Sequence, residues 1–151
     1  MSVGPFPAAP LVARLAERVP RAKIVGTVAD LATALNPETP PNASPALYVV
    51  INERGKPVKY TGPSVVVQDC DVTVGVVLLV RNAQGERLGT GARTLADALI
   101  TDIRTALLGW TPADAFNSLS FLAGRDDSYR TGWYAGQQMF RTDYRMQQVT
   151  P

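Results

Sequence analysis

The stretch SVVVQDCDVTVGVVLLV, residues 64–80, decides the fold. Apolar side chains occupy every second position from Val72 to Val80, which is the period of a β-strand. The opposite face is polar from Asp69 to Gly75 and apolar at Val77 and Leu79. We therefore expect one face of this strand to be core throughout, and the other to be wet at its start and covered at its end.

The flanking segments predict three helices and four further strands. After an N-terminal arm of residues 1–10, apolar residues recur at helical spacing over 11–19 and again over 95–108, where Gly109 is suited to end the helix. Asp30 is a suitable N-cap for a short helix over 31–35. The predicted strands are 23–28, 46–51, 119–125 and 132–146, and the connections are 36–45, 52–63, 81–93 and a turn from 126 to 128.

This order of elements favours one domain over residues 1–151. It predicts an α+β fold, with a mainly antiparallel sheet of long strands and helices packed on one face.

The two longest strands exceed the size of a compact globule. A domain of this length has a diameter of about 40 Å. The strand over 64–80 would measure about 55 Å, and that over 132–146 about 50 Å, at ~3.3 Å per residue. Such strands must bend, with Asp69–Asp71, Gly75 and Gly136 as candidate sites, or project beyond the domain.

A projecting strand pair would expose backbone hydrogen-bonding groups and aromatic side chains of the kind enriched at protein interfaces, namely Trp133, Tyr134 and Phe140. A monomer with such a surface risks edge-to-edge aggregation, and a closed ring removes that risk. The alternative is that the strands bend and stay within one monomer, and the pattern alone leaves both open.

Composition excludes several classes of function. The chain has 15 basic and 13 acidic residues, a balance that argues against a nucleic-acid-binding protein. It has no histidine, which excludes Ser-His-Asp and Cys-His catalysis, and one cysteine, which excludes an internal disulfide. We expect no transmembrane helix and no signal peptide, because neither apolar pattern is found.

Two acidic pairs are the remaining candidates for chemistry. Asp126 and Asp127 could form a catalytic dyad, although neighbours in a turn rarely aim into one cleft. Asp69 and Asp71 could ligate a hard cation, although the solvated half of a strand explains them more simply. We expect no enzyme activity, no metal and no cofactor, and we expect Cys70 to be a buried thiol.

The connection over 81–93 is glycine-rich and precedes a helix, as a phosphate-binding loop does. It lacks the spacing and the Lys-Ser/Thr of such a loop, so we expect a flexible connection. Its arginines could contact nucleic acid or an acidic partner, and they are Arg81, Arg87 and Arg93.

Several segments in this order resemble the tail terminator proteins of long-tailed, lambda-type bacteriophages. They are LVARLAERVP (11–20), VADLATAL (28–35), VGVVLLVRN (74–82), ALLGWTP (106–112) and GRDDSYRTGWYAGQQMFRTDYRM (124–146). In the last segment Phe140, Thr142 and Tyr144 match a phenylalanine–threonine–tyrosine pattern. The chain departs from the family at Gln137 and Gln138, where an acidic residue is expected.

The resemblance implies an α+β protein without catalytic residues that assembles as a hexameric ring. Such a ring binds the last ring of tail tube protein, once the tape measure protein has set the tube length, and stops polymerisation. It then presents a surface to the neck and head-completion proteins, and genome DNA passes through its lumen without sequence-specific binding. The expected location is the head-proximal end of the virion tail, after assembly in the host cytoplasm.

Interface candidates follow from physical reasoning alone, because no family motif assigns them. They lie in the strand 132–146, the 81–93 loop and the 52–63 loop, and the individual residues are Arg81, Arg87, Arg93, Trp133, Tyr134, Phe140, Arg141 and Tyr144. The alternatives are another head–tail connector or a tail-tube subunit on a related fold, a nucleic-acid-binding module that uses the arginine-bearing loop, and an enzyme with an Asp, Glu, Lys or Tyr site.

Overall fold

The computed structural model describes residues 3–36, 38, 40–58, 65–82, 90–127, 129 and 131–149. Its elements in chain order are α1 (Ala8–Arg18), β1 (Ile24–Gly26), α2 (Val28–Ala34), β2 (Ala46–Gly55), β3 (Val67–Arg81), α3 (Thr90–Leu107), β4 (Ser120–Asp127) and β5 (Trp133–Gln147). Every predicted helix and strand is found. Among the described residues, no helix combines the length and apolar character needed to cross a membrane.

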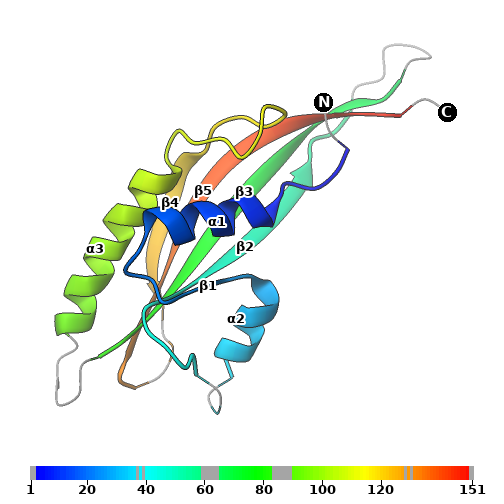
Figure 1. The fold of residues 1–151 in the computed structure, drawn as a ribbon. Helices are drawn as coiled ribbons and strands as arrows, with labels where there is room; N and C mark the ends of the chain where they lie inside the picture. Colours follow the sequence, from blue (N-terminus) through cyan, green and yellow to red (C-terminus); the bar gives the residue numbers. More distant parts are fainter. Residues whose placement is uncertain are drawn as a thin grey trace.

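The strands form one sheet in the order β1-β2-β3-β5-β4 (Figure 1). β1 pairs with β2 in parallel, and all other neighbours are antiparallel. The α+β class and the mainly antiparallel sheet are therefore confirmed.

Several element ends differ from the prediction because strand pairing overrides local composition. β2 continues through the polar residues Asn52–Gly55, because its register with β3 extends to the pair Gly55 and Cys70. β4 runs through Asp127, where a turn was expected, because Asp127 pairs with Ala135. α3 begins at Thr90, inside the expected loop.

α1 and α3 cover one face of the sheet. Leu11 and Leu15 of α1 and Leu99 of α3 are fully buried there. They pack with the alternating face of β3, where Val74 and Val76 are also fully buried. The strand that decided the fold therefore has the core face that its sequence predicted.

The prediction that all helices lie on one face is wrong for α2. Ala34 of α2 packs in a second cluster with Tyr48 of β2 and Leu79 of β3. These strand residues alternate with those beneath α1 and α3, so α2 covers the opposite face. The apolar switch at Val77 and Leu79 was the sequence signal for this second layer.

The prediction that Asp30 is the N-cap of α2 is wrong, because the N-cap is Thr27. Asp30 is at the third helical position, and its carboxylate accepts a hydrogen bond of 2.9 Å from the Thr27 backbone N–H. This is a capping box, in which the acidic residue reaches back to the cap.

The β3–β5 ladder is long and unbroken. Both strands have 15 residues, and their pairing runs from Val67 with Gln147 to Arg81 with Trp133. The register shift in the sheet lies between Phe121 and Ala123 of β4, away from all the predicted bend sites. β2, β3 and β5 extend past α1 and α3 toward both chain termini, so this end of the sheet projects beyond the helix layer (Figure 1).

Candidate interaction surfaces

The predicted interface residues fall into an exposed group and a buried group. Phe140 is fully buried and Tyr144 is 4% exposed, so the expectation that Phe140 is exposed is wrong. Both belong to the core cluster under α1 and α3. Arg141 is exposed, Trp133 and Tyr134 are half-buried, and Arg87 lies outside the described residues.

Arg93 links the start of α3 to the edge of the sheet. Its Nη1 atom donates to Asp126 at 2.7 Å, and its Nε atom donates to Asp97 at 3.1 Å. The guanidinium also lies 5.4 Å from the centre of the Tyr134 ring. Two carboxylates therefore neutralise this cation, which weakens the case for a nucleic-acid contact through Arg93.

Tyr134 and Asp126 form the other half of this cluster. The Tyr134 hydroxyl donates to Asp126 at 2.6 Å. Hydrogen bonds from Tyr134 and Arg93 hold the pKa of Asp126 below its ordinary value. Burial and the bond to Asp126 raise the pKa of Tyr134 to about 12. Tyr134 is therefore a neutral donor at physiological pH.

The adjacent carboxylates of Asp126 and Asp127 do not converge. Asp126 contacts Arg93 and Tyr134, whereas Asp127 forms an ion pair of 3.1 Å with Arg125. Neighbours in a strand point to opposite faces of the sheet, which separates the two groups. This geometry argues against a catalytic dyad.

Arg81 and Trp133 form a paired position at the α2 end of the sheet. The Arg81 guanidinium lies 5.9 Å from the centre of the Trp133 ring. The Trp133 ring meets Tyr129 edge to face at 5.7 Å, and the Tyr129 hydroxyl donates to the Ala34 carbonyl at 2.6 Å. This chain of contacts joins α2 to the ends of β3 and β5.

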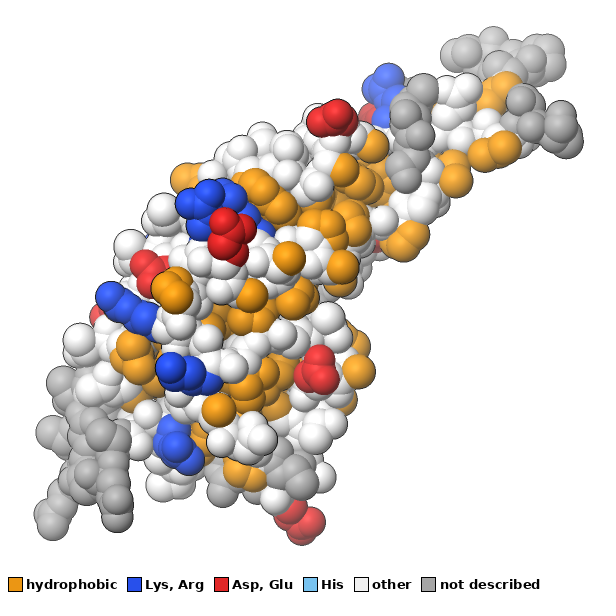
Figure 2. All heavy atoms as spheres, viewed as in Figure 1, with side chains coloured by type: hydrophobic (Ala, Val, Ile, Leu, Met, Phe, Trp, Pro, Cys, Tyr) orange, Lys and Arg blue, Asp and Glu red, His pale blue; other side chains and the backbone are white. Residues whose placement is uncertain are grey.

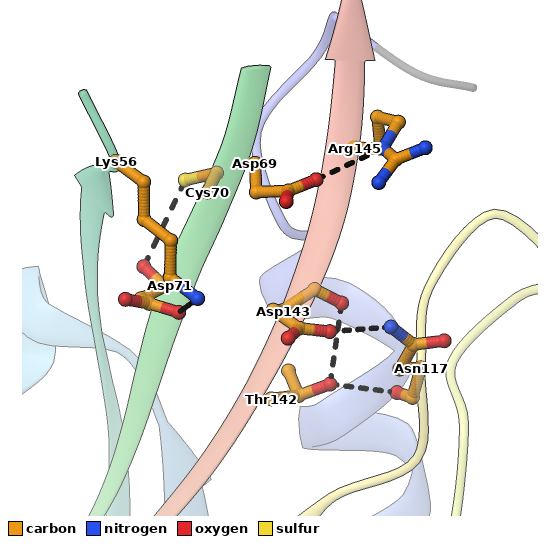
Figure 3. A network of polar contacts seen from close by, with 8 residues as sticks. All are labelled: Lys56, Asp69, Cys70, Asp71, Asn117, Thr142, Asp143 and Arg145. Carbon is orange, nitrogen blue, oxygen red and sulfur yellow. Dashed lines mark hydrogen bonds and ion pairs between the residues drawn. The ribbon is translucent and has the colours of Figure 1, made fainter. Parts of the chain in front are cut away.

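Ion pairs cover the polar face at the opposite, projecting end (Figure 3). Asp69 accepts a hydrogen bond of 2.9 Å from Arg145, which lowers the Asp69 pKa, and Asp71 lies 3.5 Å from Lys56. Each candidate cation ligand thus has a basic partner of its own. Within the described ranges, no group of three His, Cys, Asp or Glu residues could hold a metal ion.

Asn117 and Cys70 flank this network (Figure 3). Asn117 donates to the carboxylate of Asp143, and its carbonyl accepts from Thr142 at 2.9 Å. These bonds hold the loop before β4 against β5. Cys70 is 3% exposed, as its place on the core face predicted, and burial raises its pKa.

The N-terminal arm packs against the core cluster beside the projecting end of the sheet. Phe6 is buried and its ring meets Phe116, which in turn meets Tyr144, both at 5.0 Å. One oxygen of Glu53 accepts from the Phe6 backbone N–H at 2.7 Å and from the Tyr144 hydroxyl at 2.9 Å. Tyr144 was predicted as an interface residue together with the rest of the strand 132–146. The local sequence does not show that the N-terminal arm, which is distant in the chain, packs against it.

The two edges of the sheet are further candidate surfaces. Sequence reasoning missed the β4 edge, whereas Asn52–Gly55 of the β2 edge lies within the 52–63 segment that it named as an interface candidate. β4 is an edge strand, and Phe121 and Leu122 on it are 41% and 45% exposed. At the other edge, β1 pairs only with Ala46–Tyr48 of β2. The rest of β2, Val49–Gly55, has no neighbouring strand on its outer side among the described residues.

On the face shown in Figure 2, the basic and acidic side chains lie as separate small groups, and the basic groups do not merge into one continuous patch. Such a surface gives no electrostatic footprint for a nucleic acid.

Comparison with known proteins identifies the family. No match was found among curated proteins. The family model described as phage tail terminator protein matches residues 1–151, the whole chain. Members of this family are structural virion proteins and not enzymes. The chain therefore belongs to the phage tail terminator family and is a structural component of the virion tail.

Proposed function

We propose that this protein forms a hexameric ring at the head-proximal end of the tail tube. The ring stops polymerisation of the tube protein and then presents its other side to the neck and head-completion proteins. The observation that carries this proposal is the family match over residues 1–151.

The shape of the subunit supports the proposal. Termination requires one side of the ring to copy the contact between tube rings, and the other side to refuse a further tube ring. The two ends of this sheet differ chemically. One end carries α2 and the Arg81–Trp133 pair, and the other carries the ion pairs of Asp69 and Asp71 on projecting strands. A subunit with unlike ends gives a ring with unlike sides.

The charge distribution fits a lumen that DNA passes without sequence-specific binding. The net charge is +2, and Arg93 and Arg145 are both paired with carboxylates. Tight binding of DNA phosphates needs several unpaired cations on one surface. Such binding would hinder the passage of DNA through the lumen.

Imaging of the purified protein tests the assembly. Size-exclusion chromatography with light scattering should give a hexamer mass, and negative-stain images should show single rings. Long tubes would instead identify a tail-tube-type subunit, and a strict monomer at high concentration that does not bind tail tubes would reject the proposal.

Phage tails made without the protein test the biological role. We expect tubes that exceed their normal length and fail to join heads. Tails of normal length that join heads would exclude a terminator.

A further inference from the structure

Among the described residues, two strand edges without a neighbouring strand lie at opposite sides of the same sheet. They are the outer edge of β2 over Val49–Gly55 and the outer edge of β4 over Ser120–Asp127. The two edges have nearly equal lengths. Exposed backbone edges attract further strands, and natural proteins cover or interrupt them. In the single chain the side chains of Asn52–Gly55 on β2 are exposed, and so are those of β4 except for the half-buried Ala123.

The directions of these strands are compatible with each other. Successive antiparallel pairings from β2 through β3 and β5 to β4 make β2 and β4 run in opposite directions. If the sheet continues from one copy into the next with its orientation kept, β4 of one copy meets β2 of its neighbour in the antiparallel sense. This contact joins two different surfaces, so it can repeat around an axis and close a ring.

We propose that β4 of each copy pairs in antiparallel fashion with β2 of the next copy and so builds the ring contact. This inference rests on the ring of the proposed function and names the surfaces that form it. Main-chain hydrogen bonds supply the contact, as in strand addition to a sheet edge. An antiparallel register that overlays the two edges sets Arg54 opposite Ser120 and brings Asn52 to the irregularity of β4 at Leu122. Arg54, Asn52, Ser120 and Leu122 are all exposed.

Cysteine cross-linking tests the contact and its direction. The variant R54C/S120C places both thiols on the face opposite α1 and α3, because Arg54 pairs with Asp71 and Ser120 pairs with Arg141. The matched control R54C/R125C uses the same face, since Arg125 pairs with Gln137. Its second thiol lies about 13 Å farther along the sheet at ~3.3 Å per residue, because the partners of Ser120 and Arg125 on β5 are four residues apart. The native Cys70 is buried, so the wild-type protein gives the background level of cross-linking.

We expect R54C/S120C, treated with a short bis-maleimide, to give a ladder of covalent oligomers up to the full ring. We expect R54C/R125C to give at least tenfold less product, and R54C or S120C alone to give none. A stronger ladder from R54C/R125C would overturn the antiparallel register. Dimers from S120C alone would overturn the head-to-tail contact in favour of a two-fold one.

The failure of this inference differs from the failure of the proposed function. Rings that are visible by electron microscopy but do not cross-link in R54C/S120C would overturn the edge contact and leave the ring intact. If the wild-type protein forms no rings, the proposed function and the edge contact both fail.

Discussion

Arg104 of α3 donates a hydrogen bond of 2.9 Å from its Nε atom to Oε1 of Gln138 in β5. Gln138 is only 3% exposed, and the Arg104 guanidinium also lies 4.5 Å from the centre of the Phe121 ring. This arginine therefore ties α3 to both β5 and the edge strand β4. Gln138 stands where the family pattern led us to expect an acidic residue, and it still accepts a bond from a cation.

We expect R104A to lower the free energy of unfolding by about 1–3 kcal/mol, because the buried Gln138 loses its charged donor. Chemical denaturation measures this change. The control R18A removes an exposed arginine whose ion pair with Glu17 is 4.0 Å long, and we expect it to have almost no effect. Equal losses in R104A and R18A would show that the bond to Gln138 contributes nothing.

The same bond predicts an order among substitutions of Gln138. Q138E keeps an acceptor for Arg104, whereas Q138L leaves the guanidinium without one. We expect Q138L to be the less stable variant by about 1 kcal/mol or more in thermal or urea unfolding. The opposite order would mean that desolvation of the carboxylate outweighs its bond to Arg104.

The hydroxyl of Tyr144 fastens the N-terminal arm through Glu53. Y144F removes a bond of 2.9 Å to Glu53 and one of 3.3 Å to the Gly4 carbonyl, and keeps the ring against Phe116. We expect a loss of about 1 kcal/mol in the free energy of unfolding. Amide exchange should also become faster at Phe6, whose N–H shares Glu53. Faster exchange throughout the sheet, with no difference at Phe6, would contradict a role in holding the arm.

Acid should destabilise the protein through Asp126. Its folded pKa lies below the ordinary value of 3.8, so its contribution to stability is fully present above that pH. The contribution disappears as the pH falls through the folded pKa, because protonation then weakens the bonds from Tyr134 and Arg93. We expect the melting temperature of D126N to fall less than that of the wild type between about pH 4 and pH 2. D114N, at another exposed aspartate, is the control, and an equally small fall in D114N would refute the assignment.

The sequence predicted the layers of this fold better than its contacts. The alternation around Val74 identified the central strand, and Val77 and Leu79 signalled a second covered face. The same local pattern could not show that α2 covers that face. The face of a sheet on which a helix packs depends on the path of the chain between them. Phe140 was assigned to a surface for the same reason. Its neighbour Phe121, 5.8 Å away between ring centres, comes from a strand, SFLAGRDD, in which half of the residues are polar.

The edge contact predicts that one exposed leucine matters for assembly and another does not. L122K places a charge on the outer edge of β4, where lysine is a natural block to strand pairing. L108K changes a leucine that is 59% exposed just beyond α3, against 45% for Leu122, so it controls for a general effect of added charge. We expect L122K to reduce the ring fraction at least tenfold in size-exclusion chromatography with light scattering, and L108K to leave it unchanged. Both variants should keep the melting temperature of the wild type within a few degrees, because neither side chain is in the core. Rings that persist in L122K, or disappear equally in L108K, would show that β4 is not the surface that joins the copies.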